Sequence, residues 1–340
     1  MRAWALAAVL GLTACGLSRP PVDYGDAGLG IAPLSPLQHG EPFKPALVAF
    51  PYGTPMAVDS DHAFLYALEP NELMLSQTYA VGDGGAWDPL GVRTGPAGNS
   101  YLFTGSGTVY LLDPDNGGAS VFAALGAAPV AFAAWRAVGG GVVWAPTPET
   151  ASALDGDGAD AGQFEAPAGY AISALAPDAN GSVYAGLVSD GGCSGLAALG
   201  GDAGVLAQAF GSGPCVMALS GNNEVLWLAA GGDGGAALYE ILARSLPDPS
   251  AVEAEYAVPN LTPIQLVVHS DTTGNALRLG VRGEQPGATI GLAQVSALEA
   301  GFAFQTISAN EITAPTDIAF DEDGHLYVSD PPGSRIVVVY

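Results

Sequence analysis

Short runs of apolar, β-branched and aromatic residues alternate along most of the chain with clusters of Gly, Asp, Asn and Pro. The clearest example lies near the carboxy terminus, where Leu326–Val328 and Ile336–Val339 are such runs. Short runs of this composition, bounded by turn residues, are typical of β-strands. Asp323-Gly324, just before the first run, supplies the positive φ that a tight hairpin requires. The pattern predicts an all-β chain built from consecutive hairpins.

The carboxy-terminal unit, Ala314–Val339, reads as strand, acidic glycine turn, strand, Pro-Gly loop and strand. It resembles the NHL repeat, a unit of β-propellers. The residues that carry this resemblance are Pro315, Asp321, Gly324, Leu326-Tyr327-Val328, Asp330 and Arg335-Ile336. The resemblance covers about one blade and implies a propeller, in which four-stranded sheets pack radially around a common axis.

Weaker copies of this unit precede it. Their expected second strands are centred on Tyr66, Phe103, Trp144, Tyr184, Trp227, Leu279 and Tyr327. Successive centres lie 37 to 52 residues apart, and a period of about 40 to 50 residues indicates four strands per blade. Residues 43–340 therefore predict a seven-bladed β-propeller, at about 43 residues per blade. Six or eight blades also fit the longest steps, and a two-sheet β-sandwich is the alternative that explains the regular spacing less well.

Closure of the ring gives a more specific prediction. The chain ends at Tyr340, after the third strand of the last blade. A missing fourth strand would leave an unpaired sheet edge. The apolar run Ala46–Phe50 precedes the first expected blade and has no other assignment. We therefore predict that the last blade is closed by this N-terminal strand, in the outer position.

Composition indicates a globular chain and restricts its partners. The 48 Gly and 26 Pro accompany 49% hydrophobic residues, enough for a large core. Asp and Glu number 34 against 9 Lys and Arg, for a formal net charge of −25. Nucleic acids and anionic headgroups are bound by clustered basic residues. We therefore expect no nucleic-acid partner, and cationic ligands or divalent metals are electrostatically favoured.

The amino terminus has the order of an export signal, since Arg2 precedes an apolar stretch too short to span a bilayer. Leu12-Thr13-Ala14-Cys15 resembles the bacterial lipobox. That resemblance implies a signal peptide over 1–14, lipid attachment (a diacylglyceryl group and a fatty acid such as palmitate) at Cys15, and anchoring in a lipid bilayer of the cell envelope. Gly16 favours the outer membrane by the same resemblance. An ordinary secretory signal is the alternative. Residues 15–42 are rich in Pro and Gly and are expected to form a flexible tether.

Two cysteines remain in the body of the chain, Cys193 and Cys215. In an oxidising compartment this pair is expected to form a disulfide between the fourth and fifth blades. Free buried thiols, or half of a metal site, are the alternatives. Neither cysteine belongs to a CxxC motif, and no histidine lies nearby in the sequence.

The candidate metal ligands are Asp155, Asp157 and Asp160, which are closely spaced carboxylates in a glycine-rich turn suited to calcium. The turn departs from the EF-hand pattern, and a solvated turn between strands is the alternative that we favour. Asp321 and Asp323 are explained by hairpin geometry. None of the four histidines, His39, His62, His269 and His325, belongs to an HxH or HExxH motif, so no zinc site is predicted.

Together these features favour an envelope-anchored, non-catalytic propeller that binds an envelope protein or a small ligand. The resemblance also admits an enzyme, because related propellers include metal-dependent lactonases and lyases with carboxylate, Asn and His ligands at the channel mouth. A structural or assembly role in the envelope is the third alternative. The side chains in the central channel separate the first two: an acidic and His-rich cluster favours the enzyme, and an apolar lining favours the binding module.

Overall fold

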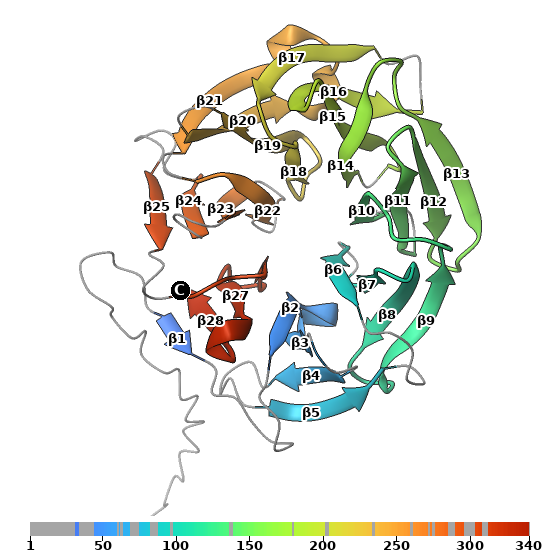
Figure 1. Cartoon of the computed structure of the whole chain (residues 1–340), viewed down its shortest axis with the longest axis vertical. Coiled ribbons are helices and arrows are strands. Elements are labelled where there is room, and N and C mark those ends of the chain that lie inside the picture. Colours follow the sequence, from blue (N-terminus) through green and yellow to red (C-terminus); the bar gives the residue numbers. More distant parts are fainter. Residues whose placement is uncertain are drawn as a thin grey trace, which may run out of the picture.

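The computed structural model of the chain is a ring of seven four-stranded antiparallel sheets (Figure 1). This confirms the predicted seven-bladed β-propeller. The structure describes residues 31–33 and 44–339, apart from 60, 62–63, 69–74, 82–87, 96–97, 136–138, 179, 201–203, 233–234, 259–260, 271–272, 274–275, 285–289, 296–302 and 308–311.

Each blade has one strand at the central axis and three progressively farther from it (Figure 1). The innermost strands are β2 (Pro45–Ala49), β6 (Pro89–Thr94), β10 (Ala131–Ala134), β14 (Ala171–Pro177), β18 (Val216–Leu219), β22 (Pro263–Ser270) and β26 (Asp317–Phe320). The second strands are β3 (Met56–Asp59), β7 (Ser100–Thr104), β11 (Gly141–Thr147), β15 (Val183–Ser189), β19 (Val225–Gly232), β23 (Ala276–Gly283) and β27 (Leu326–Asp330).

The outer half of each blade follows the same order. The third strands are β4 (Phe64–Leu68), β8 (Thr108–Asp113), β12 (Thr150–Asp155), β16 (Gly192–Leu199), β20 (Gly235–Leu242), β24 (Ile290–Gln294) and β28 (Arg335–Val339). The outer strands are β5 (Leu75–Ala80), β9 (Gly118–Ala124), β13 (Asp160–Glu165), β17 (Val205–Gly211), β21 (Val252–Val258), β25 (Ala303–Ile307) and β1 (Ile31–Pro33). Short 3-10 turns occur at η1 (Pro51–Gly53), η2 (Ala243–Ser245), η3 (Pro249–Ala251) and η5 (Pro331–Gly333).

An amino-terminal strand closes the last blade, as predicted, but it is not the predicted strand. β1 pairs antiparallel with β28, with Ala32 opposite Val338. Ala46–Phe50 instead forms β2 and its end, and β2 is the innermost strand of the first blade. All five residues of β2 are buried, which suits an inner strand packed on both faces. The closing strand falls inside the segment 15–42 for which we expected a tether.

The same difference corrects the repeat alignment in the first blade. Tyr66 lies on β4, a third strand, whereas the other six expected centres lie on second strands. The error arose because β3 and β4 also form an apolar hairpin around an acidic turn, and this pattern does not distinguish the second hairpin of a blade from the first. The predicted number of blades was still correct. The first blade gained β2, which we had assigned to the last blade, as its innermost strand.

Seven apolar clusters hold the ring together, one between each pair of neighbouring blades. The cluster between the last blade and the first contains Val48 and Phe50 of the β2 segment with Tyr327 and Val338. The rings of Phe50 and Tyr327 meet edge to face, with centroids 4.7 Å apart. Closure therefore rests on buried side chains as well as on the β1–β28 pairing.

The predicted disulfide joins Cys193 of β16 to Cys215, just before β18. It links the fourth blade to the fifth, and both residues are buried in the cluster between those blades. Within the described residues, no helix has the length and apolar character needed to cross a bilayer.

Candidate functional site

The innermost strands surround a central cavity of about 510 Å³, and every blade contributes to its lining. Most lining residues are apolar. Among the described lining residues, the polar side chains are those of Arg93, Thr94, Ser173 and Gln265. Small-molecule sites typically have volumes of about 300 to 1,000 Å³, with mostly apolar walls and a few placed polar groups. The channel therefore has the size of a ligand site, and its lining side chains are mostly apolar.

One end of the channel has an apolar rim. Val130 and Ile264 stand at or near the beginning of inner strands β10 and β22, line the cavity, and are 50% and 37% exposed. Each inner strand turns into its second strand at its carboxyl end, so all seven run in the same direction. The two side chains therefore stand at the same end of the channel, while Thr94 and Phe320 line the other end.

Arg93 of β6 is the cationic side chain among the described lining residues. Its Nη1 donates a hydrogen bond of 2.7 Å to the carbonyl oxygen of Val92. Its Cζ lies 4.7 Å from the centre of the Phe132 ring, a cation–π contact with the next blade. Arg93 is half-buried and lines the channel. Burial lowers the pKa of Arg93, while the charge of Asp317 raises it. Arginine nevertheless stays protonated in proteins.

Asp317 lies behind the channel wall at the start of β26 and is 3% exposed. Its Oδ2 accepts from the backbone N–H of Val48 at 3.0 Å, and its Oδ1 accepts from Nε2 of Gln265 at 2.6 Å. Nε of Arg282 donates to Oε1 of Gln265 at 2.9 Å. Burial raises the pKa of Asp317, and the Val48 N–H and the guanidinium of Arg93 oppose that rise. This network therefore connects the sixth, seventh and first blades beside the channel.

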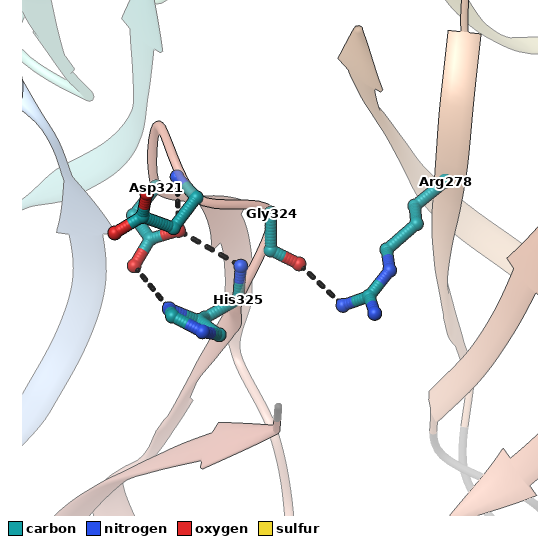
Figure 2. A network of polar contacts seen from close by, with 5 residues as sticks. Arg278, Asp321, Gly324 and His325 are labelled. Atoms are coloured by element: carbon teal, nitrogen blue, oxygen red, sulfur yellow. Dashed lines mark hydrogen bonds and ion pairs between the residues drawn. The ribbon is translucent and has the colours of Figure 1, made fainter. Parts of the chain in front are cut away.

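A second polar cluster occupies the hairpin between β26 and β27 (Figure 2). Oδ1 of Asp321 accepts from the backbone N–H of His325 at 2.8 Å, and Oδ2 lies 2.9 Å from Nδ1 of the same histidine. Arg278, on the neighbouring blade, donates to the Gly324 carbonyl at 2.7 Å. Gly324 has a φ of 82°, the left-handed conformation expected from the Asp-Gly sequence. The hydrogen bond to Asp321 raises the pKa of His325.

The same hairpin holds the residues best placed for a metal. Possible ligand atoms of Asp321, Asp323 and His325 all lie within 4.8 Å of one another, and no other such group occurs among the described residues. His269 lies across from the hairpin, where burial lowers its pKa. Both Asp321 oxygens already accept hydrogen bonds within the hairpin. These hydrogen bonds are those of a hairpin turn.

The calcium candidates from the sequence lie at the turn between β12 and β13. Oδ1 of Asp155 accepts from the N–H groups of Asp157 and Ala159, at 3.0 and 2.9 Å, and Oδ1 of Asp160 accepts from Gly162 at 3.0 Å. The structure does not gather Asp155, Asp157 and Asp160 into a group of ligand atoms among the described residues. The printed contacts of the Asp155 and Asp160 side chains are hydrogen bonds within the turn, and calcium binding here stays an untested expectation.

Several residues singled out from the sequence lie outside the described residues. Cys15 and the signal segment are among them, so lipid attachment stays a prediction. His39 and His62 lie outside them as well. Sequence reasoning missed Arg93, although one signal was available, because Arg93 is a charged residue inside an apolar inner-strand sequence in a chain with very few cations.

No family model matches the chain, and no curated protein matches its sequence. Solved structures match its fold. A streptogramin B lyase is 10% identical with a TM-score of 0.64, covering 92% of this chain and 97% of that one. A virginiamycin B lyase from Staphylococcus aureus is 10% identical with a TM-score of 0.65, covering 92% and 99%. The hydrazine synthase of Kuenenia stuttgartiensis is 9% identical with a TM-score of 0.63, covering 89% and 96%. At these identities the likeness shows the propeller fold alone.

Proposed function

We propose that this protein is a lipoprotein of the bacterial envelope, anchored through Cys15, whose propeller is a non-catalytic module that binds a small ligand in its central channel. The observation that carries the binding role is the lining of the cavity. Apolar side chains dominate it, and its few polar groups come from different blades. Ligand sites in proteins have this character, because apolar walls supply affinity and a few polar groups fix the orientation.

Binding in the channel is tested with N-phenyl-1-naphthylamine, a neutral apolar dye whose fluorescence rises on leaving water. We expect saturable binding to the folded domain. Ala134→Phe and Ala218→Phe each add a ring to a half-buried position that lines the channel, on β10 and β18. Each variant should weaken dye binding while keeping the far-ultraviolet circular dichroism of the parent. Dye binding that is absent, or that neither variant weakens, contradicts the proposed binding role.

The anchor is tested by metabolic labelling with an alkynyl palmitate in a bacterial host. The parent chain should incorporate the label and sediment with membranes. Cys15→Ser should lose the label, because its hydroxyl cannot carry the thioether-linked diacylglyceryl group. Label retained in the Cys15→Ser chain would rule out attachment at this residue. This result is independent of the channel experiment.

A lyase-like enzyme is the second candidate, and one observation favours it. Asp321, Asp323 and His325 bring two carboxylates and an imidazole within 4.8 Å on a hairpin, and two of the matching structures are a streptogramin B lyase and a virginiamycin B lyase. Incubation of the domain with virginiamycin B and Mg²⁺, followed by mass spectrometry, distinguishes the candidates. Our proposal predicts no conversion. Turnover that Asp321→Asn abolishes would establish the enzyme instead.

A further inference from the structure

Arg93 makes the channel selective for the charge of its ligand. We infer that the channel binds a small amphiphile with one anionic group, a carboxylate or a group of similar shape, which pairs with the Arg93 guanidinium while its apolar part lies along the channel wall. This inference rests on the proposed binding role and adds the chemical class of the ligand.

The hydrogen bonding of Arg93 is incomplete. A guanidinium carries five N–H donors. Among the described residues, the one hydrogen-bond acceptor of Arg93 is the carbonyl oxygen of Val92, which accepts a hydrogen bond from Nη1. The Nε–Nη2 edge is therefore available, and that edge presents two parallel donors in the geometry that a planar carboxylate accepts. The Phe132 ring covers one face of the guanidinium and restricts how it can turn.

The carboxylate of Asp317 compensates the charge of Arg93 only in part. Asp317 influences its pKa through space, yet no ion pair joins the two, within the 4.0 Å that defines one, in the part of the chain that the structure describes. The Asp317 oxygens are occupied by the N–H of Val48 and by Gln265. The guanidinium of Arg282 also interacts electrostatically with the Asp317 carboxylate. Two guanidinium groups thus face one carboxylate, and this part of the channel has an excess of positive charge.

A cation at an enclosed apolar wall is costly unless an anion or several acceptors compensate it. Here the protein supplies one carbonyl, one aromatic ring and the charge of Asp317, which Arg93 shares with Arg282. A bound anion would supply the missing acceptors, and pairing at a half-buried position is stronger than pairing in water. The cost of holding Arg93 at this wall is therefore offset when an anionic ligand is present.

The apolar part of the ligand follows from the surrounding wall. Between Arg93 and the rim, the lining comprises groups such as Phe132, Ala131 and Leu266, and the rim itself carries Val130 and Ile264. The five successive lining positions 130–134 span about 13 Å at the rise of a β-strand. A chain or ring system of that length can lie against apolar side chains while its charged end reaches Arg93.

The test uses displacement of N-phenyl-1-naphthylamine by three ligands with the same ten-carbon chain: decanoate, 1-decanol and decylammonium. For the parent domain we expect decanoate to displace the dye at about 10- to 100-fold lower concentration than decanol, as for charge-assisted hydrogen bonds. Decylammonium should be the weakest of the three. The net charge of −25 would by itself predict the opposite order.

Arg93→Gln should abolish the preference for decanoate over decanol and leave dye binding intact. The matched control is Arg244→Gln, which removes the same charge from a side chain that is 71% exposed. It should keep the preference. If decanoate and decanol are equivalent in the parent domain, or if Arg93→Gln retains the preference, the inference is wrong while the binding role stands. If the dye does not bind in the channel at all, the binding role itself fails. The comparison in the parent domain decides the inference even if Arg93→Gln does not fold.

Discussion

Asp317 is the residue on which ring closure should depend most strongly. It sits at the start of the last blade and is almost completely buried. Its two oxygens bind the backbone of Val48 in the first blade and the amide of Gln265 in the sixth. The neighbouring Thr316 adds a hydrogen bond from its hydroxyl to the carbonyl of Ala46. One side chain thus joins three blades at the point where the two ends of the propeller meet.

The cost of removing this carboxylate can be worked out from its partners. In Asp317→Ala the N–H of Val48 loses its acceptor, and a buried unsatisfied donor costs about 1 to 3 kcal/mol. Gln265 loses less, because its Nε2 also donates to the Ile318 carbonyl at 3.1 Å. The guanidinium groups of Arg93 and Arg282 lose their counter-charge. Removing one member of a buried charged network costs about 3 to 5 kcal/mol. We therefore expect the free energy of unfolding to fall by about 4 kcal/mol.

Asp317→Asn should have about half that effect, roughly 2 kcal/mol, because the amide oxygen can replace only one of the two acceptors. The assay is urea unfolding followed by tryptophan fluorescence and circular dichroism. Glu322→Gln is the matched control, because it removes one negative charge from an exposed position in the same blade, and it should change stability by less than about 0.5 kcal/mol. If the free energy of unfolding of Asp317→Ala differs from that of the parent by less than about 0.5 kcal/mol, this account of ring closure is wrong.

Three further predictions concern the disulfide, the closing strand and the hairpin histidine. Replacing Cys193 and Cys215 by Ala should lower the free energy of unfolding by about 3 kcal/mol in urea titrations, and a chain as stable as the parent would contradict this. Deleting residues 16–34 removes β1 (Ile31–Pro33) and exposes the edge of β28, so size-exclusion chromatography should show larger species than the parent chain forms. His325, whose pKa Asp321 raises, contributes stability below its unfolded value of about 6.5 that is lost as pH rises through the folded value. The parent should therefore exceed His325→Gln in unfolding midpoint at pH 5.5 by more than at pH 8.5, and an equal difference at both pH values would disprove the coupling.

Local patterns identified the fold because propellers repeat a unit whose turn chemistry is visible in sequence. Asp323-Gly324 was read as a tight hairpin, and the structure has Gly324 at positive φ with Asp321 accepting backbone hydrogen bonds from the turn. The regular spacing of the expected strand centres, six of which lie on second strands, gave the blade count. Both signals are local, since each depends on residues close together in the chain.

The identity of the closing strand could not be read in the same way. The β1 segment is short, and its pairing with β28 spans nearly the whole chain. The run Ala46–Phe50 was the stronger strand in sequence, and for that reason it was assigned to the vacant position. Its uninterrupted apolar character was nevertheless informative, because outer strands expose one face and inner strands are covered on both. Applying that criterion would have placed it at the inner position of the first blade.

The channel was even less accessible to sequence reasoning, because its polar groups come from strands far apart in the chain and become neighbours only when the ring closes.

The charge of the chain illustrates this difference between sequence and structure. The total of −25 favoured cationic partners, yet total charge governs solubility and long-range attraction, while the potential at a binding site is governed by the charges nearest to it. At the channel wall those charges are Arg93, Arg282 and a single carboxylate, Asp317, whose oxygens are already hydrogen-bonded. An acidic surface therefore surrounds a locally cationic channel. The net charge and the local charges act on a ligand at different distances. Salt at physiological concentration screens most of the repulsion from the acidic surface beyond about 8 Å, and it weakens a buried contact much less. An anionic ligand is thus disfavoured far from the protein and favoured once inside the channel.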